Sequence, residues 1–255
     1  MNLIVLAAGK GNRLGKFTQK IPKVLLPLIE EKTILDFHLA YAHAAGAIEK
    51  TIIVSGFGDK YIRNFVREHP LSNQIDICFN PFYGLSGPLG SIWAIKDRLL
   101  EDDFILCNGD TFFETEFYNR FNIENSQGIY LGIDTSKSIV ADDMKVILAD
   151  GRVLNVSKST SVEDADGVST GMIFIAGLEA RRSFVNALWQ LVGNEENLIK
   201  NVPWHQIVNE LAKRNSPVNA VDMSDLKWHE VDTPDDLDIS EKILNRFSHL
   251  TDDLL

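Results

Sequence analysis

The sequence contains no long apolar run, only two cysteines, and fewer basic than acidic residues. Its apolar stretches fall well short of the roughly 20 residues that a membrane-spanning helix needs, and no basic segment precedes the first of them, as a secretory signal would require. We therefore expect a cytoplasmic protein without a membrane partner. Cys78 and Cys107 both lie in apolar, strand-like segments, and in this compartment we expect them to be buried and reduced.

The excess of acidic residues limits the kinds of partner. The chain has 25 Lys and Arg against 36 Asp and Glu, a net charge of -11, whereas general nucleic-acid binders present basic faces to phosphates. We therefore expect no nucleic-acid partner. An acidic protein can still bind a small anion where a few neighbouring cations make the local electrostatic potential positive. A length of 255 residues suits one large α/β domain.

Residues 3–28 carry the pattern that says most about function. Leu3 to Leu6 form a short apolar run typical of a buried parallel strand, which ends in the small residues and cations of residues 7–13, AAGKGNR. Glycines let backbone N–H groups approach a ligand closely, and Lys10 and Arg13 add positive charge, so this loop suits phosphate oxygens.

Two common glycine motifs do not fit this loop. The dinucleotide-binding pattern G-x-G-x-x-G would need glycine where the chain has Leu14. The P-loop pattern G-x-x-x-x-G-K-[ST] fails because five residues separate Gly9 from Gly15 and because Phe17 follows Lys16. Since a single residue matters in a loop that wraps phosphates, the sequence predicts neither motif.

The stretch instead resembles the signature of the sugar-phosphate nucleotidylyltransferases and the related cytidylyltransferases. That signature runs L-A-A-G-x-G-x-R-L, a gap containing Thr, and P-K-x-L-L-P; the chain matches it over residues 6–14, at Thr18 and over residues 22–27, with Lys16-Phe17 where many sugar enzymes carry Pro-Leu. The resemblance implies a Rossmann-like (GT-A-like) α/β fold with a mixed, mainly parallel sheet and flanking helices, in which this loop wraps an NTP triphosphate. It implies nucleotide-binding roles for Leu6, Ala7, Ala8, Gly9, Lys10, Gly11 and Asn12, and catalytic roles for Arg13 and Lys23.

The following segments alternate between strand and helix. After a helix capped by Thr33, apolar runs at residues 51–54 and 75–79 flank a helical segment at residues 59–68. This β-α-β-α-β order favours a parallel sheet with right-handed crossovers. Ligands of such sheets bind beyond the carboxyl ends of the strands, where the signature loop lies.

Polar residues follow the next strand. Asn80, Ser86 and Gly87 belong to a glycine-rich loop ahead of a helix, an arrangement suited to a base and phosphate pocket. In related enzymes the matching segment recognises the nucleobase, and an ordinary loop with a helix cap is the alternative.

A further strand at residues 104–107 ends in Asn108-Gly109-Asp110. This resembles the Gly-Asp motif of the family, in which the aspartate holds Mg²⁺ and Asn108 would border the nucleotide. A hard cation between phosphate oxygens needs carboxylates on a rigid edge, and a strand end beside a glycine turn provides one. We therefore expect Asp110 to be a metal ligand.

From about residue 127 the pattern changes to strands joined by turns. Asp150-Gly151 between apolar runs predicts a hairpin, and residues 161–167 predict an acidic, exposed loop. The resemblance implies that Lys158, at a strand end, contacts the acceptor phosphate; a solvated lysine is the alternative. Gly171, inside a strand, either lets the acceptor approach closely or marks a bulge.

A helix is expected from Pro203 to about Arg214, because proline is favourable at a first helical position. It would carry Trp204 and His205 in its first turn, and there we expect His205 to be a capping or surface residue.

Residues 227–237, KWHEVDTPDDL, resemble the second metal motif of the family. The spacing of Thr233, Pro234 and Asp236 predicts a capped helix start, which accounts for these residues without any function. It does not account for Glu230 and Asp232, which alternation places on one face of a strand. We expect Asp232 to be the partner of Asp110 at Mg²⁺, and Glu230 to contribute to the acceptor site.

The three motifs together imply a nucleotidyl transfer with release of pyrophosphate. We expect one domain, residues 1–255, in which residues 1–126 bind the nucleotide and residues 127–255 the acceptor. The compact length and the pattern W-x-E-V-D-T-P-D-D-L most resemble the phosphocholine-type cytidylyltransferases, which favours CTP and a small phosphorylated acceptor. The alternatives are a sugar-1-phosphate uridylyl- or guanylyltransferase and a catalytically silent nucleotide-binding regulatory domain.

Overall fold

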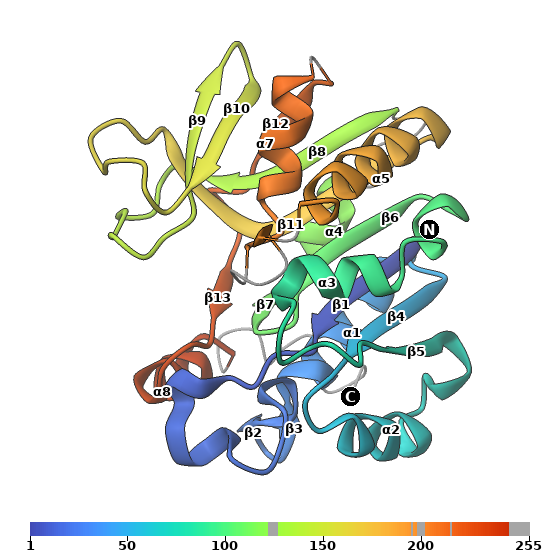
Figure 1. The fold of residues 1–255 in the computed structure, drawn as a ribbon. Helices are drawn as coiled ribbons and strands as arrows, with labels where there is room; N and C mark the ends of the chain where they lie inside the picture. Colours follow the sequence, from blue (N-terminus) through green and yellow to red (C-terminus); the bar gives the residue numbers. More distant parts are fainter. Residues whose placement is uncertain (122–126, 195, 198–201, 215, 245–255) are drawn as a thin grey trace.

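The structure is a computed structural model that describes residues 1–121, 127–194, 196–197, 202–214 and 216–244. Its described residues contain a large sheet that runs through both halves of the chain in the order β5-β4-β1-β6-β11-β8-β12-β10-β9 (Figure 1). In chain order the strands are β1 (Asn2–Ala7), β4 (Lys50–Ser55), β5 (Ile75–Phe79), β6 (Phe104–Asn108), β8 (Gly128–Asp134), β9 (Lys145–Ala149), β10 (Arg152–Ser157), β11 (Gly167–Ala176) and β12 (Val218–Asp222). The expected division after residue 126 adjoins residues 122–126, which lie outside the described residues.

Parallel pairing occupies the part of the sheet where the sequence predicts it. β5, β4, β1 and β6 pair in parallel, and β12, which the sequence reading did not include, pairs in parallel with β8. β11 pairs antiparallel with β6 and with β8, and the predicted hairpin at Asp150-Gly151 joins β9 to β10. The predicted mixed α/β fold is confirmed.

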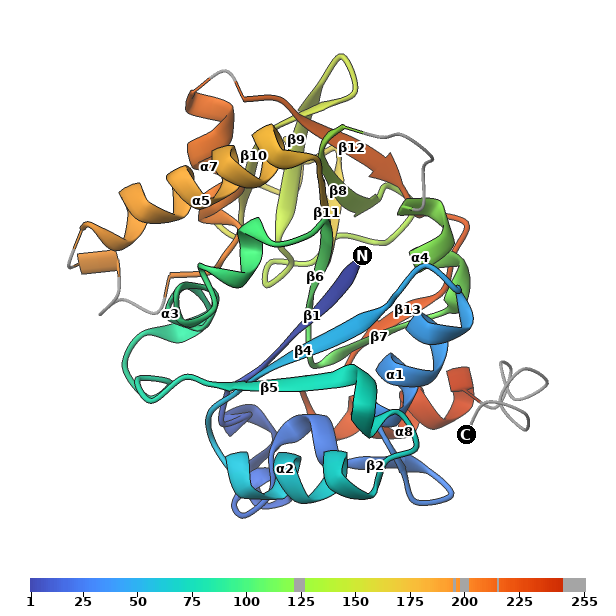
Figure 2. The same cartoon turned by 90° about the vertical axis from the view of Figure 1, so that its right-hand side faces the viewer.

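Helices cover both faces of the sheet, with α3 and α5 on one side and α1 and α4 on the other (Figure 2). The helices are α1 (Ile34–Ala44), α2 (Asp59–Glu68), α3 (Gly87–Ala94), α4 (Thr115–Phe121), α5 (Leu178–Val192), α7 (Gln206–Lys213) and α8 (Pro234–Leu244). Thr33 caps α1 through a reciprocal pair of hydrogen bonds with Asp36, as its sequence predicts. Within the described part of the chain, no helix combines the length and the apolar character that a bilayer crossing requires.

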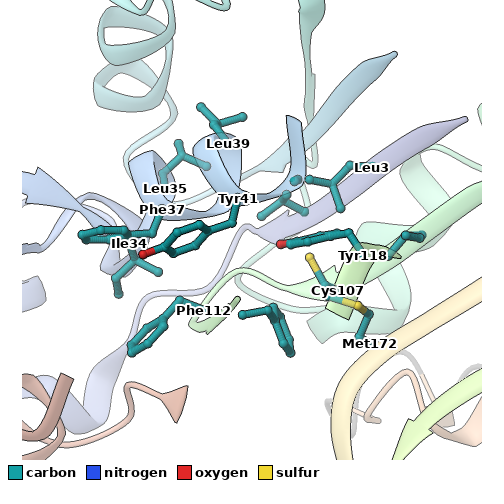
Figure 3. Packing of buried hydrophobic residues seen from close by; sticks show 14 of the residues in the cluster. Leu3, Ile34, Leu35, Phe37, Leu39, Tyr41, Cys107, Phe112, Tyr118 and Met172 are labelled. Atoms are coloured by element: carbon teal, nitrogen blue, oxygen red, sulfur yellow. The ribbon is translucent and has the colours of Figure 1, made fainter. Parts of the chain in front are cut away.

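Two apolar cores follow from burial of the central strands on both faces. In β1, Leu3 and Val5 join the core beneath α1, whereas Ile4 joins the core beneath α3, because successive strand side chains point to opposite faces. Figure 3 shows Leu3 and Cys107 in the first core, where Tyr118 of α4 packs beside Cys107. Burial on both faces accounts for continuous apolar runs in these strands.

The two cysteines are free, as predicted, but only Cys107 is buried. Cys78 is half-buried because β5 is the edge strand of the sheet. The prediction of two buried thiols is therefore wrong for Cys78.

The helix expected from Pro203 begins later, at Gln206. His205 is the N-cap residue of this helix, as one of its two predicted roles has it, although its side chain makes no capping hydrogen bond. It is 3% exposed, so the other prediction, a surface residue, is wrong. The ring of His205 stacks on Trp204, which is also buried. Proline at position 203 was therefore a misleading signal for the helix start, because the chain makes one more turn over the core before α7.

Candidate active site

A pocket of about 620 Å³ opens beyond the carboxyl ends of β1 and β6. Of the residues predicted from the sequence, those that line it are Leu6, Ala7, Ala8, Gly9, Lys10, Gly11, Asn12, Arg13, Lys23, Gly87, Asn108, Asp110 and Asp232. The predicted residues therefore converge on one cavity, although they come from four separated stretches of the chain.

The floor of the pocket depends on close approach of two strand ends. The Gly109 N–H donates a hydrogen bond to the Leu6 carbonyl at 3.0 Å. A Cβ at Gly109 would lie 2.5 Å from that carbonyl oxygen, so only glycine lets the segment after β6 lie against the end of β1. This contact places Asp110 directly beside the signature loop.

The signature loop is held by glycine and threonine. Gly11 has a φ of +63°, a conformation that glycine adopts at little cost, and its carbonyl accepts a hydrogen bond of 2.7 Å from the buried Thr18 hydroxyl. The 3-10 helix Asn12–Thr18 follows. Gly9 is exposed and has open space where a Cβ would lie, so a ligand can approach its backbone.

A short two-stranded sheet brings the second carboxylate to the first. β13 (Trp228–Glu230) pairs antiparallel with β7 (Thr111–Phe113), with Glu230 opposite Thr111. The pairing continues as the Val231 N–H donates to the Asp110 carbonyl at 2.8 Å. Asp232 then precedes α8, whose predicted cap is present as Asp236 accepts hydrogen bonds from Thr233. The last motif of the chain is thus fixed next to Asp110.

Lys23 lies between these two carboxylates. Its Nζ is 3.0 Å from Asp110 Oδ2 and 2.5 Å from Asp232 Oδ1, and its side chain is only 9% exposed. Burial disfavours the charged form, but Asp110 and Asp232 more than offset this effect, so the pKa of Lys23 lies above its ordinary value. The ammonium is therefore a fixed positive charge at the wall of the pocket.

Three carboxylates gather at this point. Atoms of Asp110, Glu230 and Asp232 all lie within 4.8 Å of one another. The Glu230 side chain reaches solvent, but the protein around its carboxyl and the charges of Asp110 and Asp232 raise its pKa to about 8. A glutamate with this pKa is largely protonated at neutral pH, so Glu230 adds little negative charge to the ion pairs that Asp110 and Asp232 form with Lys23.

Arg13 joins the same cluster and extends it toward the second half of the chain. Its Nη2 is 2.7 Å from Asp232 Oδ2, and its Nη1 is 2.9 Å from Asp142 Oδ2. Lys158 lies 2.7 Å from the other oxygen of Asp142. Lys158 itself is exposed and does not line the pocket, but Asp142 connects it to Arg13.

Asn80 and Ser86 support the pocket from behind rather than lining it. Asn80 is 1% exposed, and its amide donates to Ser91 Oγ at 3.1 Å while its Oδ1 accepts from the Phe82 N–H at 2.9 Å. Gly90 lies against Ser86, where a Cβ would come within 2.2 Å of the serine Cβ. These contacts shape the loop whose Tyr83, Gly84 and Leu85 form a wall of the pocket.

Gly171 and Glu230 also lie outside the pocket lining. Gly171 is buried in β11 with a φ of +77°, and the register of β11 against β8 shifts near it. It lies against the Asn108 side chain. Glu230 lies within the carboxylate cluster.

Sequence reasoning gave no site role to Asp142, Trp204 or Tyr83. Asp142 belongs to a stretch without a motif, and Trp204 was placed in the first turn of a helix. Tyr83 stands next to predicted residues, and its position between Asn80 and Ser86 was the signal that could have identified it.

Comparison with known proteins agrees with this arrangement. The family described as MobA-like NTP transferase domain matches residues 3–125. The bifunctional IPC transferase and DIPP synthase of Aquifex aeolicus is 24% identical over 94% of this chain and 51% of the relative. The choline-phosphate cytidylyltransferase of Streptococcus pneumoniae is 23% identical over 79% of this chain and 84% of the relative.

Solved structures show the same fold. The inositol-1-phosphate CTP transferase from T. maritima superposes with a TM-score of 0.80 and 18% identity, over 100% of this chain and 97% of that one. The chain spans about half the length of several curated relatives that it matches, including the Aquifex aeolicus protein.

Proposed function

Because residues 3–125 match the family described as MobA-like NTP transferase domain, we propose that the chain transfers the NMP of an NTP, CTP by preference, to a small phosphorylated acceptor. An oxygen of the acceptor phosphate attacks the α-phosphorus of the NTP, the bond from that phosphorus to the bridging β-phosphate oxygen breaks, and pyrophosphate leaves. The observation that carries this proposal is the position of Lys23 between Asp110 and Asp232 at the wall of a glycine-lined pocket.

The residues of the chain supply positive charge and alignment. Lys23 and Arg13 would neutralise phosphate oxygens near the reacting phosphorus, where charge builds up as pyrophosphate leaves. Lys158 would hold the acceptor phosphate, so that the two reactants are kept in line. The acceptor phosphate is already ionised at neutral pH, so the reaction requires no general base.

We propose Mg²⁺ as the cofactor, held by Asp110 and Asp232. The donor set fits, because Mg²⁺ prefers carboxylate oxygens and phosphates as ligands. The pKa of Glu230 is raised first by burial and then by the negative charges of Asp110 and Asp232, and a divalent cation would offset these charges. When bound, the ion would neutralise charge on the phosphates during transfer.

The preference for CTP rests on the compact C-terminal pattern and on the similarity to a choline-phosphate cytidylyltransferase and an inositol-1-phosphate CTP transferase. A sugar-1-phosphate uridylyl- or guanylyltransferase is the second candidate. We propose the cytoplasm as the compartment, because NTPs are available there.

Pyrophosphate release tests the proposal. CTP, UTP, GTP, ATP and dTTP would each be mixed with Mg²⁺ and a panel of phosphocholine, sugar 1-phosphates and other small phosphomonoesters. We expect turnover with CTP and a non-sugar phosphate, and none for Asp110→Ala. Turnover only with a sugar 1-phosphate would favour the second candidate. NTP binding without turnover across the panel would contradict an enzymatic function and favour a nucleotide-binding regulatory domain.

A further inference from the structure

The Asn108 side chain lies at the pocket, and one of its two polar atoms is held by protein. Its Oδ1 accepts a hydrogen bond of 2.8 Å from Trp204 Nε1. An indole N–H can only donate, so the amide oxygen must face it. Among the residues that the structure describes, Asn108 Nδ2 has no hydrogen-bond acceptor. The NH₂ group is therefore a donor that remains available to a ligand.

Trp204 is itself rigidly placed. Its side chain is 1% exposed, and its ring stacks on His205 with a centroid distance of 3.9 Å. His205 Nε2 is 2.9 Å from Ser169 Oγ, and the same hydroxyl accepts a hydrogen bond of 3.1 Å from the Gly171 N–H. The Ser169 hydroxyl therefore connects the Gly171 backbone to the imidazole of His205. A buried series of contacts thus runs from β11 through His205 to the indole.

Gly171 provides the space for the Asn108 amide. A Cβ at this position would lie 2.7 Å from Asn108 Nδ2, closer than non-bonded atoms approach. Any other residue would push the amide away from its position. The backbone of β11 therefore limits Asn108 on one side while Trp204 holds it from another.

We infer that Trp204 is a positioning residue for nucleotide binding, whose indole N–H orients Asn108 so that Nδ2 donates to an oxygen of the bound nucleotide. This inference rests on the proposed function. A freely rotating amide would lose its rotational freedom when it donates to an oxygen of the nucleotide. The Asn108 amide is already fixed by Trp204, so its N–H groups point in one direction before the nucleotide binds. The arrangement therefore lowers the entropic cost of binding.

The test is a double-mutant cycle on CTP binding. Trp204→Phe retains an aromatic ring in the core and removes the N–H, and Asn108→Ala removes the amide. Kd for CTP with Mg²⁺ would be measured by calorimetry for the wild type, both single variants and the double variant. We expect each single change to raise Kd about three- to tenfold, as loss of one hydrogen bond does. The double variant should bind about as Asn108→Ala does, because both changes remove the same interaction.

Trp189→Phe is the matched control. Trp189 is 51% exposed on α5 and contacts Trp93 edge-on, so the same chemical change there should leave Kd unaltered. Thermal unfolding would be followed for every variant. Gly171→Ala provides a second route to the same effect: it should raise Kd by displacing the Asn108 amide while leaving Trp204 intact.

The inference is overturned if Trp204→Phe binds CTP as the wild type does, or if its cost persists in the Asn108→Ala background. The second result would mean that Trp204 acts by packing alone. Failure of the proposed function is a separate outcome, because it is judged by turnover of the wild-type protein. A wild-type protein that binds no CTP and none of the other four NTPs would overturn both.

Discussion

Asp142 and Arg13 form an ion pair of 2.9 Å although 129 positions separate them in the sequence. The second Asp142 oxygen pairs with Lys158, so one carboxylate holds two cations that we propose for phosphate binding. The backbone around Asp142 is well supported. Lys145, 1% exposed, donates from Nζ to the carbonyl oxygens of Ala141 and Asp143 on either side of it. Asp142 is thus held in place beside the two cations that we propose for phosphate binding.

Removal of this anion is expected to strengthen phosphate binding. Both terminal nitrogens of Arg13 are paired with carboxylates, so a phosphate must compete for them. The ion pairs of Asp142 with Arg13 and Lys158 are exposed to solvent, which screens the charges and makes the pairs weak. Asp142→Asn should lower Kd for pyrophosphate about threefold, measured by calorimetry. Asp225→Asn, which removes an exposed ion pair with Arg120, is the control. Weaker binding by Asp142→Asn would instead mean that Asp142 orients the two cations.

Loss of a carboxylate from the cluster is expected to weaken binding of a divalent cation. Mn²⁺ binding can be followed by its electron paramagnetic resonance signal without any substrate. Loss of an outer-shell partner already costs a metal site about tenfold in affinity, so Asp110→Asn or Asp232→Asn should cost at least about tenfold. Asp225→Asn should bind Mn²⁺ like the wild type. Unchanged Mn²⁺ affinity in both cluster variants would exclude these residues as ligands.

Two buried histidines should make the protein less stable as pH falls from 7.5 to 5. Burial lowers the pKa of His38 to about 4 and that of His205 to about 3, whereas both take up a proton near pH 6.5 when unfolded. Protons therefore favour the unfolded state below pH 6.5, and the loss continues until the folded pKa is reached. At roughly 1.4 kcal/mol for each pKa unit, the contribution of the two histidines to the free energy of unfolding should fall by several kcal/mol, while Glu230, with its raised pKa of about 8, acts in the opposite direction.

Urea denaturation across this pH range measures the effect, while most carboxylates remain ionised. His205→Gln removes one of the two groups and should make the dependence less steep. The same pH dependence of the free energy of unfolding in the wild type and in His205→Gln would contradict the prediction.

The two pocket glycines Gly109 and Gly84 should differ sharply in their tolerance of alanine. A Cβ at Gly109 would meet the Leu6 carbonyl oxygen at 2.5 Å, whereas a Cβ at Gly84 would meet nothing within 4 Å. Gly109→Ala should therefore destabilise the protein by about 1–3 kcal/mol, as overpacking does. Gly84→Ala should be neutral or slightly stabilising. Thermal unfolding of the two variants provides the comparison, and equal stability would contradict it.

The sequence predicted the first half of the chain more fully than the second, for physical reasons. The strands at residues 51–54 and 75–79 are apolar and bounded by helical segments, so local patterning and connection rules determine their pairing. The motif residues of the signature loop lie at fixed spacings within residues 6–27, so the loop can be identified from the local sequence alone. β7 and β12 were not predicted, because Thr111–Phe113 and Val218–Asp222 are short and become strands only through pairing with distant segments.

The difference between local sequence patterns and contacts between distant segments also applies to the residues of the site. Lys23, Asp110 and Asp232 were identifiable from motifs, and the structure brings them together. Trp204 and Asp142 reach their positions through long-range packing, and neither residue type nor spacing marks them. The burial of His205 depends on Ser169 and Trp204, which no periodic pattern connects.

The pairing of β13 with β7 can form only late in the synthesis of the chain, because β13 lies near its C-terminal end. Lys23 meets partners that lie 87 and 209 positions further along. A ribosome that has released the chain only as far as β12 has already produced the glycine loop and the first carboxylate. The second carboxylate, and the strand that fixes it, come later. The cluster of Lys23 with its two carboxylates is therefore completed only after the strands of the large sheet have been synthesised.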